Sequence, residues 1–362
     1  MAKRIRLPRI HPGWLAAAAG AALTGWVAWT VFQPVPPRRR RGSVATPDEA
    51  ALRGFVEKLT AEFAPRDGSD RAVLHRAADW LAGEMQAAGA RVVTPGLGAQ
   101  LVPAVIGSVG PGPRPRVIVT ARFDTPAGSP GAADAASAAV LLGLARLLAD
   151  EPPASAVDLV LLADSSAATA NAADPASTAT TDDSLPAASP VAGRLGDGHA
   201  GRWATDQMRR AAVAHARALA DDADVAAVLC LETLGCFNDE RGSQHFPGPV
   251  PDNILPDRGD FVALIGRFGE GRPVRRLKAA LREASSVPVL SINGTAGAGE
   301  AAHDEHLAYR RVRFPVVRLT DTGPWRNARL GTAADTADSL DFARLADFAG
   351  GLAHAIRSLA AR

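Results

Sequence analysis

The residues of this sequence that could do chemistry stand where its apolar segments end. Arg122 and Asp124 follow the short β-branched run 117–121. Asp134 opens the apolar helical segment that comes next, and Glu232 ends a later apolar strand. Burying a carboxylate without a partner at such a strand end is costly. Glu232 therefore favours a paired or liganded site over an isolated surface acid.

Each of these side chains also has a purely structural interpretation. Asp134 could cap its helix by accepting hydrogen bonds from free backbone N–H groups, a role that is compatible with metal ligation. Arg122 could be an exposed arginine at a strand end. We favour a bridging role, because a guanidinium pairs well with carboxylates. Arg122 is then expected to join Asp134 and Glu232.

Two histidines form a second candidate group. His303 and His306 lie three residues apart in the run AHDEHLAY, so they would share one side of a helix. A helical histidine pair can bind a metal ion, and the two residues are alternative ligands. The polar end of an ordinary helix is the interpretation that we favour.

The elements that must position these groups follow an alternating pattern. Helical spacing covers 48–63, 70–88, 135–149, 203–219, 274–284 and 341–359, and apolar strand patterns cover 117–121, 157–163, 226–234, 261–266, 288–292 and 315–320. Apolar strands separated by helices predict a mainly parallel sheet with helices on both faces. Sites in such sheets form beyond the carboxyl ends of the strands.

The N-terminal residues differ from the rest of the chain. A basic tail over 1–12 precedes the uncharged segment 13–32, which as a helix would span about 30 Å, the thickness of a bilayer core. We interpret 13–32 as a transmembrane anchor and 33–46 as a Pro- and Arg-rich linker. A cleaved signal peptide is the first alternative, but no small-residue cleavage site follows. A buried soluble helix is the second, and arginines on both flanks oppose it.

Charge and composition exclude several function classes. Residues 1–41 hold eight cations and no acid, so the net charge of +2 leaves −6 on residues 42–362. The positive charge is confined to one end, and no nucleic-acid partner is expected. Two cysteines exclude a disulfide-dense scaffold and a four-cysteine zinc site. The stretch 165–200 consists mostly of small and polar residues and is expected to be a disordered, low-complexity insertion.

Four motifs, in order, resemble the zinc aminopeptidase family that includes bacterial leucyl aminopeptidase, aminopeptidase Y and the glutaminyl cyclases. They are TARFDTPAGSPGAADAASAAVLLGLARLL (120–148), VLCLETLGCFND (228–239), GSQHFPGP (242–249) with LPDRGDFVALIGR (255–267), and FPVVRLTDTGPWRNARLGTAADTADSLDFARLADF (314–348). The resemblance implies one domain over 47–362, interrupted by the insertion. Its fold would be α/β, with a mixed, mainly parallel sheet sandwiched by helices and preceded here by one transmembrane helix.

The resemblance also implies a site with two zinc ions. In the family a bridging Asp holds both ions, each ion takes one His and one further carboxylate, and a Glu activates the water. On this alignment the bridging Asp falls at Asp134 and the later carboxylate at Glu232. The Asp of the family's His-x-Asp motif falls at Asp124. These positions keep a suitable residue type.

The other positions of the family's zinc site are replaced. Arg122 stands at the first His, and a protonated guanidinium has no electron pair to donate. Ser165 and Ser166 stand at the Glu-Glu pair that supplies the base and a ligand, and Gly331 stands at the last His. A serine hydroxyl is a poor zinc ligand and no base at neutral pH. The catalytic set is therefore not intact, and the remaining acids are vestigial ligands.

These replacements favour a membrane-anchored pseudo-peptidase without a cofactor, acting in binding or scaffolding of a peptide or an envelope protein. Analogy with the family places its domain outside the cytoplasm, although the arginines at 38–41 oppose translocation. The alternative is an active zinc exopeptidase with recruited ligands such as His199, His303 or His306. A one-metal acyltransferase like the glutaminyl cyclases is a third hypothesis, but it also needs an acidic base.

Overall fold

The structure, a computed structural model, describes most of the chain. The described residues are 12–37, 42–93, 104–112, 115–163, 212–220, 224–246, 255–294 and 306–361. The predicted insertion 165–200 lies outside these ranges, so the expectation that it is disordered stays a prediction.

Helices form over the segments whose apolar residues recur on one face. They are α1 (Pro12–Phe32), α2 (Glu49–Ala61), α3 (Arg71–Ala87), α4 (Ala132–Asp150), α6 (Gly271–Ala284), α7 (His306–Arg311) and α8 (Phe342–Ala360), with residues 212–220 also helical. Two short 3-10 turns, η3 (Gly323–Trp325) and η4 (Ala337–Ser339), precede α8. Asp48, Asp70 and Asp341 begin α2, α3 and α8, where each carboxylate accepts from a backbone N–H of the first turn.

The strands of the described residues form one mixed sheet in the order β1-β2-β4-β3-β5-β8-β6-β7. They are β1 (Arg91–Val93), β2 (Ala104–Val109), β3 (Arg116–Arg122), β4 (Val157–Leu162), β5 (Val225–Glu232), β6 (Val262–Arg267), β7 (Val289–Gly294) and β8 (Val316–Thr320). The four central strands β4, β3, β5 and β8 are parallel. β6 and β7 are parallel to each other and antiparallel to β8. The mixed, mainly parallel sheet is therefore confirmed, whereas β1 and β2 were not predicted.

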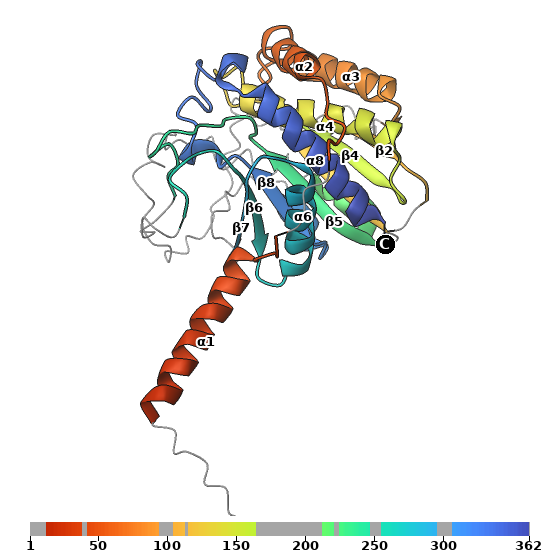
Figure 1. The fold of residues 1–362 in the computed structure, drawn as a ribbon. Helices are drawn as coiled ribbons and strands as arrows, with labels where there is room; N and C mark the ends of the chain where they lie inside the picture. The colour runs from red at the N-terminus through yellow and green to blue at the C-terminus, as the bar shows by residue number, and fades with distance from the viewer. Residues whose placement is uncertain are drawn as a thin grey trace, which may run out of the picture.

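Apolar clusters cover both faces of the sheet, as the unbroken apolar strands predict. In β3, Val117 and Val119 pack into the larger cluster, under α2, α4 and α8, while Ile118 packs into the smaller one, under the helical residues 212–220. Figure 1 shows α2, α3, α4 and α8 layered on one side of the sheet. The central helix is α4, whose alanine-rich sequence has fifteen of its nineteen residues buried.

The N-terminal segment is helical, as predicted, and projects from the domain beside β6, β7 and α6 (Figure 1). The described side chains of α1 begin at Gly20, and Gly20–Phe32 is a shorter apolar helix than a full membrane span. By length and composition, α4 is the one described helix that could cross a membrane, but 83% of its apolar window is buried inside the domain. The membrane span of α1 therefore stays a prediction.

Candidate functional site

The carboxyl ends of three parallel strands meet the start of α4 at one edge of the sheet. Arg122 ends β3, and Glu232 ends β5, where it lies in register with Thr320 of β8. Just beyond Glu232, the backbone N–H of Leu234 donates to the carbonyl of Ala133 in α4 at 3.3 Å. This edge, which we call the carboxyl-end site, thus holds the acids and the arginine that the sequence singles out.

Arg122 forms its ion pair with Asp124. Its Nε and Nη2 atoms donate to the two carboxylate oxygens at 2.9 and 2.8 Å. The two residues are two apart in extended chain, so their side chains lie on one face and meet without any rearrangement. Glu232 pairs with Arg318 instead, so the expected bridge from Arg122 to Glu232 is wrong. The charge of Arg122 does act on Asp134, whose pKa it lowers.

Glu232 pairs with Arg318, which stands in the neighbouring strand β8. Nε of Arg318 lies 2.8 Å from both carboxylate oxygens, and Nη2 lies 2.6 Å from Oε2. Nδ1 of His306, the first residue of α7, lies 3.7 Å from Oε1. Burial raises the pKa of Glu232, but Arg318 and His306 outweigh burial and hold that pKa at about 2. Glu232 is therefore a fixed anion that is paired with Arg318 and lies next to His306.

Asp134 lies in the first turn of α4 but does not cap it. The capping position is Gly131, at φ 69°, where a Cβ would lie 2.1 Å from the side chain of Thr125. The carboxylate of Asp335 takes over the capping role by accepting from the N–H of Ala133 at 3.2 Å. The interpretation of Asp134 as the cap of α4 is therefore wrong.

The pKa of Asp134 is displaced toward neutrality. Burial raises it to about 6. Arg122 and Arg66 lower it, whereas the neighbouring carboxylates Asp124 and Asp335 raise it further. Because Arg122 is already paired with Asp124, its charge stabilises the Asp134 anion only in part. Asp134 therefore holds its proton at a higher pH than an ordinary aspartic acid does.

Arg66 also belongs to the site, although the sequence analysis did not predict it. It is fully buried and donates to the carbonyls of Phe123 at 2.6 Å and Pro130 at 2.9 Å, and also to the carbonyl of Leu59. Burial lowers its pKa to about 10 against the pull of Asp134, Asp124 and Asp335. The guanidinium therefore clamps the backbone on both sides of the β3–α4 loop. A fully buried arginine next to Pro65 gives no periodic signal in the sequence.

The remaining predicted positions add no ligand to the described part of the site. Gly331 has φ 70°, and the nearest atom to a Cβ built there would be Cγ of Pro126 at 3.9 Å. A histidine would find space at that position but a strained backbone. Outside the described residues lie the other predicted positions, Ser165, Ser166, His199 and His303.

The carboxyl-end site does not fit a centre for two zinc ions. A guanidinium stands at the place of one ligand, Glu232 is already neutralised by Arg318, and Gly331 offers no donor atom. Asp134 favours its protonated form more than an ordinary carboxylic acid does. Across the described ranges, no three His, Cys, Asp or Glu side chains converge on a point that could hold a metal ion.

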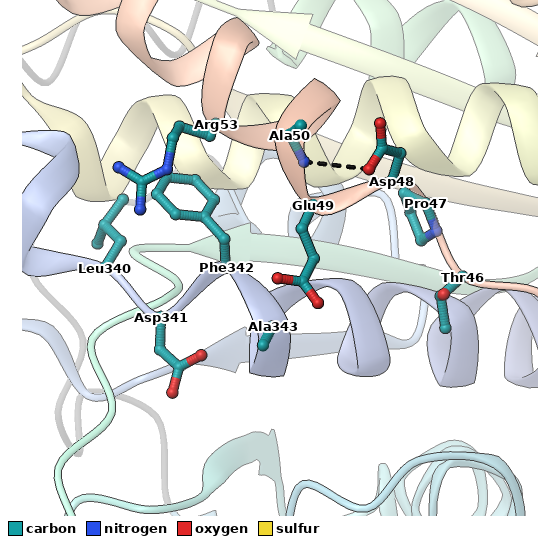
Figure 2. Close-up of a pocket in the computed structure, with 10 residues that line it drawn as sticks. All are labelled: Thr46, Pro47, Asp48, Glu49, Ala50, Arg53, Leu340, Asp341, Phe342 and Ala343. Atoms are coloured by element: carbon teal, nitrogen blue, oxygen red, sulfur yellow. Dashed lines mark hydrogen bonds between the residues drawn. The ribbon is translucent and has the colours of Figure 1, made fainter.

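A separate surface hollow of about 880 Å³ lies between the starts of α2 and α8. Figure 2 shows Arg53 over the ring of Phe342, at 4.5 Å from the ring centre, and Asp48 capping α2 through the N–H of Ala50. The hollow is lined by none of the predicted site residues, and its helix termini are already capped. We assign it no function.

Comparisons with known proteins place this fold in a recognisable class. No family model matches the chain. The sequence is 29% identical over 335 residues to the uncharacterized protein YfbL of Escherichia coli (strain K12), a match that covers 90% of each chain. Among solved structures, the glutaminyl cyclase of Fimbriiglobus ruber matches with a TM-score of 0.58 at 18% identity, covering 90% of this chain and 99% of that chain.

Two aminopeptidase structures match to a similar degree. The LapA aminopeptidase of Legionella pneumophila gives a TM-score of 0.59 at 14% identity, over 90% of this chain and 78% of its own. A leucine aminopeptidase precursor from Bacteroides thetaiotaomicron gives 0.56 at 15% identity, over 88% and 98%. The structural neighbours are thus glutaminyl cyclases and leucyl-aminopeptidase-like zinc peptidases. These structures confirm the fold that the four motifs predicted. Because their sequence identities are only 14 to 18%, the similarity concerns the fold alone.

We expect Arg122→Ala to lower the free energy of unfolding by about 1–2 kcal/mol, because it strands the buried carboxylate of Asp124. The loss is smaller than for a fully buried pair, since the Arg122 side chain is 30% exposed and water can partly replace it. Urea unfolding followed by circular dichroism measures the change. Arg146→Ala, on the exposed face of α4, is the matched control. A loss for Arg122→Ala no larger than for this control would contradict the pairing.

Proposed function

We propose that this chain is a membrane-anchored protein of the aminopeptidase fold that does not hydrolyse peptides and acts in binding or scaffolding. The observation that carries the proposal is the bidentate pair between Arg122 and Asp124. Arg122 stands where the family resemblance puts a zinc-ligating histidine. A fixed cation at that point repels a dication, and no side chain of the described site replaces the lost ligand.

The proposed setting is a single-pass membrane protein with α1 as its anchor and its domain outside the cytoplasm. The uncharged sequence 13–32 and the projection of α1 away from the domain support the anchor. Analogy with secreted peptidases alone supports the side. The partner would be a peptide or another envelope protein, bound where the family binds its substrates, at the carboxyl-end site.

An active zinc exopeptidase is the second candidate, and one observation favours it. His306 lies beside Glu232, with 3.7 Å between Nδ1 and Oε1, so an imidazole and a carboxylate do meet at the site. Zinc could recruit that pair together with His303 or His199, which lie outside the described residues. This candidate requires Glu232 to leave Arg318, which breaks the three charge-assisted hydrogen bonds between them.

Zinc content decides between the two candidates. We expect the full chain, purified in detergent without chelator, to hold far less than one zinc per chain by atomic emission. We also expect no chelator-sensitive release of arylamine from aminoacyl-arylamides. The LapA aminopeptidase, carried through the same purification, is the positive control. Stoichiometric zinc with hydrolysis would overturn the proposal and establish the exopeptidase.

A restoration variant sharpens the same test. Arg122→His returns the first ligand type but leaves Gly331 and the missing base unchanged, so we expect no gain of hydrolysis. Gain of activity in that variant would show that the rest of the zinc site is present after all.

Alkaline carbonate extraction of the wild-type chain tests the membrane anchor. We expect the chain to stay with the membrane, and its recovery in the soluble fraction would reject the anchor.

A further inference from the structure

The end of α1 is built into the globular domain. The carbonyl of Phe32, at the last turn of α1, accepts from Nζ of Lys278 at 3.0 Å and from the hydroxyl of Ser291. Lys278 and Ser291 in turn bond each other at 2.8 Å. A lysine at a helix C-terminus satisfies free carbonyls and opposes the helix dipole. The domain thus supplies the C-terminal cap of α1.

The next residue, Gln33, locks this junction. It is almost fully buried and has φ 45°, a left-handed conformation that ends the helix. Its side-chain oxygen accepts from Arg275, and a Cβ at Gly271 would lie 2.6 Å from that oxygen. Arg275 also stands 5.8 Å from the ring centre of Trp29. These contacts make α1 a fixed strut from the domain instead of a flexible tether.

The strut leaves from the side of the sheet that β6 and β7 form. β6 is antiparallel to β8, with Ala263 opposite Thr320 and Ile265 opposite Arg318. The carboxyl end of β6 therefore lies beside the beginning of β8. The seat of α1 extends from that end, where Gly271 and Arg275 begin α6, to the middle of β7, where Ser291 lies in register with Leu264. The seat is therefore separate from the carboxyl-end site, which lies at the ends of β3, β5 and β8.

An exposed apolar and basic surface surrounds the seat. Phe268, in the β6–α6 turn, is 49% exposed; outside α1, it and Val93 are the exposed large apolar side chains among the described residues. Arg272 is exposed one residue beyond the Gly271 contact with Gln33, and Arg275 is half-buried. The adjoining acid in the sequence, Glu270, does not neutralise this surface, because its carboxylate accepts from Arg310 and from the N–H of Val316.

We propose that Phe268, Arg272 and Arg275, the juxtamembrane face, rest on the bilayer that holds α1 and bind its anionic headgroups. The inference rests on the proposed anchoring of α1, since a fixed strut inside a bilayer brings this face to the headgroup layer. Phe268 supplies the apolar contact and the arginines supply the charge complementarity. The domain is then held against the membrane by α1 and this face together.

The test places a probe on the face in the intact, full-length chain. Phe268→Cys and, as control, Val93→Cys are labelled with a fluorophore in a Cys236→Ser background. Val93 is 61% exposed on β1, at the other edge of the sheet. Each protein is reconstituted into phosphatidylcholine vesicles with or without phosphatidylglycerol, and quenching by spin-labelled lipid is measured. We expect strong quenching at Phe268 that increases with phosphatidylglycerol, and little at Val93.

Charge reversal completes the test. A basic residue near an anionic surface contributes a factor of about five to binding, so Arg272→Glu should lower the quenched population about tenfold or more in phosphatidylglycerol vesicles. Arg146→Glu on α4 should leave it unchanged. Equal quenching at both probes, or quenching at Phe268 that ignores lipid charge, would overturn the proposal while the anchor itself stays intact. Recovery of the wild-type chain in the soluble fraction after carbonate extraction would instead reject the membrane anchor, and with it the proposed function.

Discussion

Arg318→Leu is expected to lower the free energy of unfolding by about 3–5 kcal/mol, because it leaves the charge of Glu232 at the end of β5 without its arginine partner. Arg318 is 8% exposed, so water cannot take its place. The double variant with Glu232→Leu should lose clearly less than Arg318→Leu alone, since no stranded charge remains. Urea unfolding of the three proteins at neutral pH measures these differences.

The surface pair between Arg344 and Asp239 supplies the control. Its side chains are 33% and 62% exposed, and Arg344→Leu should cost no more than about 1 kcal/mol. A loss for Arg318→Leu within that range would mean that the pair with Glu232 does not hold the carboxyl-end site together. Equal losses in the single and double variants would point to packing of the arginine chain instead of its charge.

Asp134→Asn is expected to stabilise the domain by about 2 kcal/mol at pH 7.5 and by little at pH 4. The pKa of Asp134 is raised by burial to about 6 from its ordinary value of 3.8, so the folded state holds this proton more tightly than the unfolded state does. The stability that Asp134 contributes is therefore present at low pH and is lost as the pH rises through 3.8 to 6. Asparagine removes the charge that causes the loss.

Thermal unfolding of both proteins across this pH window tests the linkage. Asp150→Asn, at the exposed end of the same helix, should change stability by less than about 0.5 kcal/mol at either pH. A stability difference for Asp134→Asn that is the same at pH 4 and pH 7.5 would contradict the raised pKa. A destabilised Asn variant would show that the carboxylate makes a contact that outweighs its burial.

Most of the fold could be predicted because its strands are long and apolar. Each of β3, β4, β5, β6, β7 and β8 overlaps a predicted segment to within one or two residues at either end, and the four motifs predicted a mixed, mainly parallel sheet. β1 and β2 were missed for local reasons. β1 has only three residues. The apolar sequence pattern of β2 is interrupted by Gly107, where a Cβ would lie 2.6 Å from the sulfur of Met85. Close packing against α3 requires a glycine at this position, and a requirement of that kind does not appear in the hydrophobic periodicity of the sequence.

The positions of the site residues could be predicted, but not the ion pairs that these residues form. The ends of apolar strands pointed to Arg122 and Glu232, yet the partner of each depends on which strand lies beside it. Arg318 carried a usable signal, since a charge in the middle of the apolar run VVRLT must find a buried partner. The cap of α4 by Asp335 could not be foreseen, because it joins residues about two hundred positions apart.

The clamp made by Arg66 bears on how this protein matures. Its guanidinium holds the backbone at Leu59, Phe123 and Pro130 through permanent donors that belong to the chain. The loop between β3 and α4, which carries Asp124, is therefore ordered as soon as the polypeptide has folded. Maturation of this loop therefore depends on the docking of the segment that carries Arg66, a contact that the chain supplies itself.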